Sequence, residues 1–231
     1  MADDTTTAAE LSGFLRTLAP DDAHRLVAAG SKRSVPRGGA LFLEGDHGDQ
    51  VFVLLAGRVK VFRTTPEGRE LVLSLRGPGD LVGEMAPIDG QGTQRSASVF
   101  ALEPVTARVL TGDEFRSCIL ERPAVGLALL RMLTRRLRDA DRRRAEFGGY
   151  DTSARVARLL VELCPADAAT GPGGSVELDL VLTQAELASM VGASRESVVR
   201  ALTDLRTRGL IRTGRRAITV TDPDGLRSLS D

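Results

Sequence analysis

The hydrophobic pattern of this chain changes its period near residue 113, and that change limits the possible folds more than any other feature. From residue 34 to about residue 110, short apolar runs follow a period of two, which is typical of β-strands. From residue 113 onward, apolar residues recur every three or four positions, which is typical of helices. We therefore expect a β region followed by a helical region.

Six short runs make up the β region, and glycine or proline residues separate them. The runs are residues 40–43, 50–55, 58–62, 70–75, 98–102 and 105–110. Thr65-Pro66-Glu67-Gly68 is a type I turn pattern, so its flanking runs should pair as a hairpin. Many short strands at this spacing predict an antiparallel barrel or sandwich, in particular a small jelly roll. Before them, residues 8–30 indicate two short helices, with a capping box at Thr7 and Glu10 and a second start at Pro20.

A long helix is expected to open at Pro123, because proline is favoured at the first helical position. A shorter helix over residues 113–121 precedes it, and Gly148-Gly149 ends it and would supply a hinge. Spacings of three and four form a coiled-coil seam at Leu130, Leu133, Leu137, Ala140, Arg144 and Phe147. The seam predicts a parallel dimer helix; the alternative is an ordinary amphipathic helix packed on the β region.

The residues after the two glycines predict a second, smaller unit. An amphipathic helix is expected over residues 151–163. Thr183-Gln-Ala-Glu186 is a capping box that opens another helix, and Val191-Gly192-Ala193 provides a tight turn after it.

Ser194 then caps a third helix over residues 195–207. The positions expected to face inward on this helix are Val198, Val199, Ala201, Leu202 and Leu205. Residues 210–221 indicate two strands around a glycine-containing turn. Helix, turn, helix and hairpin in this order predict a winged helix-turn-helix.

Positive charge is concentrated at the third helix and the hairpin. The whole chain balances 31 Lys and Arg against 31 Asp and Glu, so a polyanion must meet a local patch. Residues 194–216 hold seven arginines against Glu196 and Asp204. Arg195 and Arg200 can grip guanine, Glu196 can accept from cytosine, and the hydroxyls of Ser194 and Ser197 suit phosphates. The alternative, a solvated charged helix face, would more often interleave the two signs. We expect sequence-specific binding to double-stranded DNA.

The composition excludes several other chemistries. Neither of the two lysines follows a glycine, which excludes a P-loop nucleotidase. His24 and His47 stand apart from each other and from Cys118 and Cys164, so we expect no metal site and no catalytic residues. No apolar run is long enough for a membrane helix and no signal peptide is recognisable, so a cytoplasmic protein is expected, with no membrane partner.

Residues Ser194-Arg195-Glu196-Ser197-Val198-Val199-Arg200, following Thr183 to Ala193, closely resemble the helix-turn-helix of the cAMP receptor protein (CRP/FNR) superfamily of bacterial transcription regulators. Glu44-Gly45-Asp46, Ala56-Gly57-Arg58-Val59 and Arg135-Arg136-Leu137 extend the resemblance over nearly the whole chain. It implies a homodimer in which Arg195, Glu196 and Arg200 read a TGTGA-like half-site, with RNA polymerase as a further partner. Ser194, Ser197 and Thr183 complete the candidate DNA-binding set.

The same resemblance implies a cyclic-nucleotide pocket in the β region. Gly83-Glu84-Met85 and Arg95-Ser96-Ala97 are similar to the family's phosphate-binding cassette. There the glutamate accepts from the ribose 2′-hydroxyl, and the arginine, the serine and backbone amides hold the cyclic phosphate. The alternative for Arg95 is a surface position in a polar loop.

Two positions depart from the family's best-known cAMP-responsive members. Ala140 and Asp141 stand where those members place a Thr and a Ser that contact adenine. Ala140 cannot form that hydrogen bond, and Asp141 offers only acceptors. We therefore expect cAMP as the effector first, with cGMP or no nucleotide as the alternatives. The family's haem and iron–sulfur sensors are not expected, because two cysteines cannot supply a four-thiolate cluster.

In total the sequence predicts an α+β protein with three parts. Residues 1–121 form N-terminal helices and a jelly-roll barrel of the cyclic-nucleotide-binding type, residues 122–149 form the dimerisation helix and hinge, and residues 150–231 form the winged helix-turn-helix. The rival functions are a cyclic-nucleotide-regulated enzyme, for which no catalytic constellation is found, and a ligand-binding scaffold that acts through protein contacts.

Overall fold

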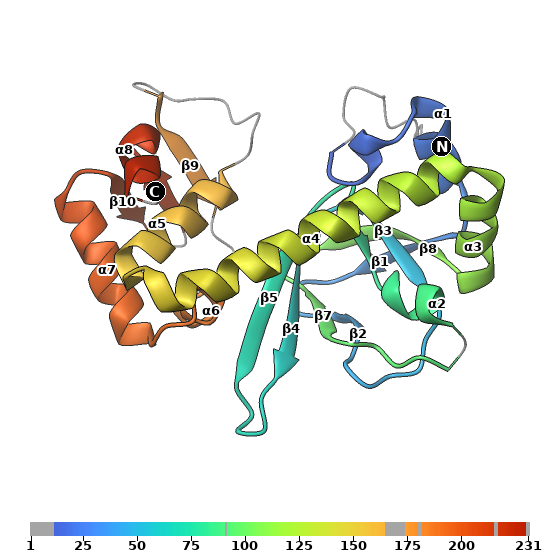
Figure 1. Cartoon of the computed structure of the whole chain (residues 1–231), viewed down its shortest axis with the longest axis horizontal. Coiled ribbons are helices and arrows are strands. Elements are labelled where there is room, and N and C mark those ends of the chain that lie inside the picture. Colours follow the sequence, from blue (N-terminus) through green and yellow to red (C-terminus); the bar gives the residue numbers. More distant parts are fainter. Residues whose placement is uncertain (1–11, 91, 165–173, 180–181, 215–216, 230–231) are drawn as a thin grey trace. The chain divides into compact units, whose positions relative to one another are not determined.

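The computed structural model describes residues 12–229, apart from residues 91, 165–173, 180–181 and 215–216 (Figure 1). The chain divides into two compact units, one of residues 1–68 with 72–138 and the other of residues 69–71 with 139–231. The long helix α4 (Pro123–Gly149) therefore contributes to both. Among the described residues, no helix combines the length and the apolar character that crossing a membrane requires.

The β region forms two four-stranded sheets with the orders β1-β8-β3-β6 and β2-β7-β4-β5. The strands are β1 (Ser31–Val35), β2 (Ala40–Phe42), β3 (Val51–Ala56), β4 (Val59–Thr64), β5 (Glu70–Arg76), β6 (Leu81–Val82), β7 (Ser98–Ala101) and β8 (Val105–Leu110). One buried cluster joins both sheets, with Phe52 and Val105 from the first and Leu41 and Val99 from the second. This two-sheet packing confirms the predicted small jelly roll.

Each of the six predicted runs overlaps a strand, and the predicted turn is present. The amide of Gly68 donates to the carbonyl of Thr65 at 2.8 Å, and β4 and β5 are neighbours in their sheet. Strands β1 and β6 are additional. Periodicity could not reveal them, because β1 buries only Val35 and β6 has two residues.

Helices cover one face of the β1-β8-β3-β6 sheet. They are the 3-10 turn η2 (Leu15–Thr17), α1 (Pro20–Ala28), α3 (Gly112–Glu121) and the first half of α4; the short α2 (Met85–Asp89) follows β6. Phe14, Phe115, Leu129 and Met132 pack with Val51 and other residues of the sheet. The predicted starts at Pro20 and Pro123 are confirmed, whereas Thr7 and Glu10 lie outside the described residues.

The two faces of α4 differ in their burial. Val125, Ala128, Leu129 and Met132 are buried against the β region, as the packed-helix alternative requires. The seam residues Leu130 and Leu137 are 62% and 63% exposed, whereas Leu133 packs partly against the core. Ala140 and Arg144 are exposed, and the side chain of Phe147 lies outside the described residues. The first half of α4 therefore packs on its own chain and leaves two of the predicted seam leucines uncovered.

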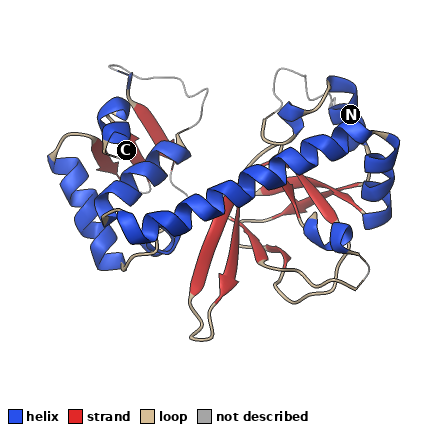
Figure 2. Cartoon of the chain, viewed as in Figure 1, coloured by secondary structure: helices blue, strands red, loops and turns tan. Residues whose placement is uncertain are grey.

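The second unit is mostly helical, with one small sheet (Figure 2). It consists of α5 (Thr152–Leu163), β9 (Val176–Asp179), α6 (Gln184–Val191), α7 (Arg195–Thr207), β10 (Ile211–Gly214), β11 (Ala217–Val220) and α8 (Pro223–Ser228). The sheet order is β10-β11-β9, so the predicted hairpin gains a third antiparallel strand that the sequence did not indicate, as it did not indicate α8.

Local signals set the helix boundaries of this unit. Thr183 and Glu186 form the predicted capping box, and Gly192 ends α6 in the left-handed conformation, with φ +60°. Ser194 caps α7, as predicted. The prediction that Val199 faces inward is wrong: it is 39% exposed, because the buried stripe of α7 runs through positions 198, 201, 202 and 205.

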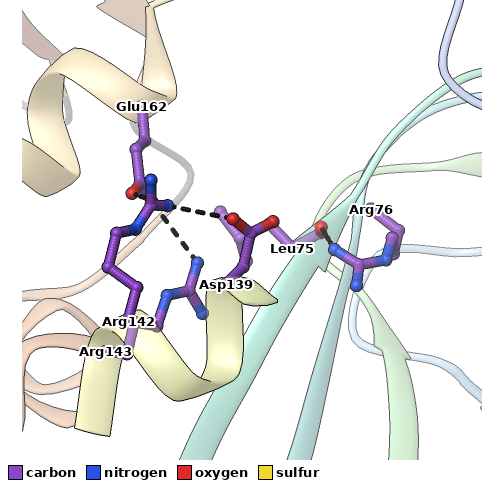
Figure 3. A network of polar contacts seen from close by, with 6 residues as sticks. All are labelled: Leu75, Arg76, Asp139, Arg142, Arg143 and Glu162. Carbon is purple, nitrogen blue, oxygen red and sulfur yellow. Dashed lines mark hydrogen bonds and ion pairs between the residues drawn. The ribbon is translucent and has the colours of Figure 1, made fainter. Parts of the chain in front are cut away.

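Ion pairs join the last turns of α4 to α5 within the second unit (Figure 3). Arg142 contacts Asp139 at 3.1 Å and Glu162 at 2.8 Å, and Arg143 contacts Glu162 at 3.4 Å. Arg158 lies over the ring of Tyr150, 4.9 Å from its centroid. These contacts connect the residues on either side of the predicted hinge at Gly148 and Gly149.

Candidate ligand pocket and nucleic-acid interface

The six predicted cassette residues line one pocket of the first unit. The space inside it, counted together with the solvent at its open mouth, is about 680 Å³. Gly83, Glu84 and Met85 come from the β6–α2 junction, and Arg95, Ser96 and Ala97 precede β7. The walls are completed by Phe42, Val61, Leu73, Ser74, Arg76, Val82, Ala86, Val99 and Arg136.

Arg95 is buried in this pocket, at 5% exposure, so the surface alternative is wrong. Its two terminal nitrogens donate to the carbonyls of Gly83 at 2.7 Å and Gln50 at 2.8 Å, and the guanidinium carbon lies 4.4 Å from the centroid of the Phe42 ring. Burial lowers the pKa of Arg95, while the carboxylates of Asp49, Glu84 and Asp46 oppose that shift. Its Nε is buried with no hydrogen-bond partner in the described part of the chain. A buried cation with an N–H to spare is suited to an anionic ligand.

Glu84 is 3% exposed and pairs with an arginine from α4. Arg136 Nη1 lies 2.6 Å from Glu84 Oε1, and Arg136 Nη2 donates to the carbonyl of Leu81 at 2.9 Å. Arg136 itself lines the pocket. The carboxylate that is expected to hold a ribose hydroxyl is therefore tied directly to the long helix.

The other four cassette residues are small or lie at the pocket surface. Gly83 has φ +82°, and a Cβ there would lie 2.8 Å from Arg95 Nη1, so only glycine fits without displacing the arginine. Ala97 is buried. Ser96 and Met85 are exposed, with the Ser96 hydroxyl 3.9 Å from the Met85 sulfur.

Several polar side chains stand at the N-terminal end of α7. Ser194 Oγ accepts from the amide of Ser197 at 3.1 Å, and Arg200 Nη2 donates to Ser197 Oγ at 3.2 Å. Arg195, Glu196 and Arg200 are exposed. Hydrogen bonds from its own backbone amide and from the Ser194 side chain, together with the two arginines, lower the pKa of Glu196. The first two turns of the helix thus display two guanidinium groups and an ionised carboxylate.

Comparison with known proteins finds a family match in each of the two units. Residues 32–122 match the cyclic nucleotide-binding domain family, and residues 154–229 match the Crp-like helix-turn-helix domain family. The chain is 38% identical to the CRP-like cAMP-activated global transcriptional regulator of Mycobacterium tuberculosis, over 83% of this chain and 84% of the relative. It is 33% identical to the cyclic AMP receptor protein of Thermus thermophilus, over 90% of this chain and 92% of the relative.

The chain belongs to the CRP/FNR family of transcription regulators. A crystal structure of a CRP/FNR family transcriptional regulator from Thermus thermophilus agrees, with a TM-score of 0.71 and 29% identity over 87% of this chain and 98% of that one. A CRP/FNR regulator binds DNA through its helix-turn-helix and is not an enzyme, as the sequence predicts.

Some polar side chains in the DNA-binding unit of this CRP/FNR regulator already have a partner within the chain. Thr183 is exposed, but its hydroxyl accepts from the amide of Glu186 at 3.2 Å and donates to the Glu186 carboxylate at 2.9 Å. Arg208 pairs with Asp204 at 3.1 Å. Arg215 and Arg216 lie outside the described residues. Arg195, Glu196 and Arg200 are the predicted side chains that α7 exposes at its N-terminal end, and the hydrogen bonds of Glu196 and Arg200 are to the neighbouring Ser194 and Ser197.

The role of Arg136 was missed from the sequence, although a signal was present. Val125, Leu129 and Met132 lie on the buried stripe of α4, and Arg136 continues that stripe four residues later. An arginine on a buried helical stripe needs a carboxylate partner. Which carboxylate it meets depends on how the helix packs on the β region.

Proposed function

We propose that this protein is a homodimeric transcription regulator that binds TGTGA-like palindromic sites under the control of a cyclic nucleotide, with cAMP as the first candidate. The observation that carries the proposal is the buried Arg95, whose Nε is uncommitted in a pocket that Glu84 also lines. The cyclic phosphate would pair with Arg95, and the ribose 2′-hydroxyl would donate to Glu84. The names of the Mycobacterium tuberculosis and Thermus thermophilus relatives favour cAMP over cGMP.

The contact between Glu84 and Arg136 suggests how the ligand reaches the DNA-binding unit. The Glu84 carboxylate pairs with Arg136 at 2.6 Å. A ribose hydroxyl that donates to Glu84 would share this carboxylate with Arg136 and so alter the ion pair. Because Arg136 belongs to α4, ligand binding then favours one position of that helix over another. In this proposal the helix-turn-helix unit pivots near Gly148 and Gly149 toward the spacing of the operator half-sites.

The exposed face of α4 supports the homodimer. Leu127, Leu130 and Leu137 are 49%, 62% and 63% exposed, and their spacings of three and seven place them on one face of the helix. A second copy would bury these side chains against their own equivalents. Two recognition helices would then meet two half-sites about one DNA turn apart. RNA polymerase is the proposed further partner, and the cytoplasm the proposed compartment.

Calorimetric titration with cAMP and cGMP tests the ligand. Arg95→Gln should weaken cAMP binding by about 30-fold or more, because a charge-assisted contact to phosphate contributes roughly 2 kcal/mol or more. The matched control is Arg58→Gln, which changes an arginine that pairs with Glu103 at 3.1 Å and does not line the pocket. A lower dissociation constant for cGMP than for cAMP would make cGMP the effector. No heat with either nucleotide, together with full operator binding, would refute the ligand proposal.

A gel shift on a TGTGA(N6)TCACA duplex tests the DNA site. The wild type should bind this duplex in preference to a scrambled one, more tightly when nucleotide is present. Arg195→Ala or Arg200→Ala should cost about 1–3 kcal/mol on TGTGA and relax the base preference. Equal weakening on every sequence would assign these arginines to phosphate instead. If the wild type binds nucleotide but does not bind the operator, the alternative function is favoured, in which the protein is a ligand-binding scaffold that acts through protein contacts.

A further inference from the structure

An exposed valine interrupts the polar face of α7. Val199 is 39% exposed, whereas its neighbour Val198 is fully buried. At 100° per residue, Val199 shares a face with Arg195 one turn before it, Glu196 three positions before it and Thr203 one turn after it. All three of these neighbours are exposed and polar.

The side chain of Val199 is suited to one kind of contact in the major groove. It presents methyl groups and no hydrogen-bonding atom, and its β-branch restricts it to few rotamers. The Thr203 hydroxyl donates a hydrogen bond to the carbonyl of Val199 at 2.9 Å, so this hydroxyl is engaged within the helix. Among the four bases only thymine presents a methyl group in the major groove.

The positions of Arg195 and Arg200 indicate which thymine of the half-site Val199 would contact. Arg195 lies one turn before Val199, and Arg200 follows it directly. The sequence TGTGA has guanines at its second and fourth positions, and the proposed function gives Arg195 and Arg200 guanines to read. A side chain between the two arginines on the helix surface would meet the base between the two guanines. That base is the thymine at the third position.

Resting on the proposed function, we propose that Val199 is a further specificity-determining residue, which contacts the C5 methyl group of the third-position thymine of each half-site. Val199 then separates TGTGA from sites with another base between the guanines. The contact involves only α7 of the second unit and not the ligand pocket of the first, so it is independent of which nucleotide controls the protein.

Replacing the third-position thymine by deoxyuridine tests the contact, because it removes the methyl group and nothing else. Anisotropy titrations with cAMP present would compare full-length wild type and Val199→Ala on both duplexes. For the wild type we expect a loss of about fourfold per half-site, the value of one buried methyl group. Val199→Ala should bind the thymine duplex about as weakly as the wild type binds deoxyuridine, and should lose little more on deoxyuridine. Val199→Thr, which keeps one γ-methyl group, should retain part of the discrimination.

Additive losses from the substitution and from deoxyuridine would overturn the inference, and so would coupling to the first-position thymine instead of the third. In either case a wild type that still prefers TGTGA to a scrambled duplex leaves the proposed function intact. A wild type without that preference overturns the proposed function and this inference with it.

Discussion

Replacing Arg136 by methionine tests whether the pairing of Glu84 with α4 stabilises the first unit. The change removes the guanidinium at 2.6 Å from the Glu84 carboxylate and the donor to the Leu81 carbonyl. Glu84 is 3% exposed, so its carboxylate would stay buried without that partner. Methionine keeps most of the aliphatic length, so the loss of packing is small.

The size of the effect follows from the burial of the pair. Removing one partner of a fully buried ion pair costs about 3–5 kcal/mol. Water reaches the Arg136 side chain, which is 23% exposed, and this places the expected loss near the lower end, at about 3 kcal/mol. For a protein of this length, that is a fall in Tm of about 6–12 °C.

Urea denaturation at pH 7 measures this loss in the free energy of unfolding. Arg135→Met is the matched control, because that neighbouring arginine is exposed, and it should change stability by less than about 0.5 kcal/mol. The double variant Glu84→Gln/Arg136→Met should recover at least half of the loss, since no charge is left buried alone. A loss below about 1 kcal/mol for Arg136→Met would refute the reasoning, and so would a double variant less stable than the single one.

Three other substitutions or conditions test local features. Gly79→Ala should cost at least about 2 kcal/mol more than Gly68→Ala in thermal denaturation, because both glycines have positive φ but only at Gly79 would the Cβ meet a backbone carbonyl, that of Ser12; equal costs would show that the N-terminal segment simply moves away. Ser194→Ala removes the cap of α7 and should lower the free energy of unfolding by about 1 kcal/mol in urea, and no change would deny the cap. The pKa of Glu196 is lowered in the folded protein, so its carboxylate stabilises the fold above the unfolded pKa. This contribution to the free energy of unfolding is lost as the pH falls through the lower folded pKa. Operator affinity should therefore not fall through this group between pH 8 and pH 5; a fall that Glu196→Gln abolishes would contradict it.

The β region shows why some strands can be predicted and others cannot. The run at Val51–Ala56 is apolar and long enough for its period to be recognised, and the turn at Gly68 carries its own chemistry. Strand β1 has four exposed residues out of five, so its hydrophobic pattern is absent. It becomes a strand only because the edge of β8 offers it hydrogen-bonding groups.

Helix α4 and helix α7 show the same division. The start of α4 at Pro123 and the caps of α6 and α7 are local and were predicted. Which face of each helix is buried depends on what lies beside it. Periodicity alone predicted that Val199 is buried. In the packed helix it is exposed.

The sequence by itself determined the order of those elements that have a recognisable period, several of their caps and turns, the family, and the residue types of both candidate sites. All of these depend on neighbours within about one helical turn or one hairpin, or on motifs that can be recognised as strings of residues. The tertiary structure alone decided that Arg95 is buried with an uncommitted N–H, that Glu84 meets Arg136 across 52 residues of chain, and that Val199 faces outward. These facts depend on how distant segments pack, and the free energy of a buried charge or methyl group depends on those neighbours and not on the chain around it.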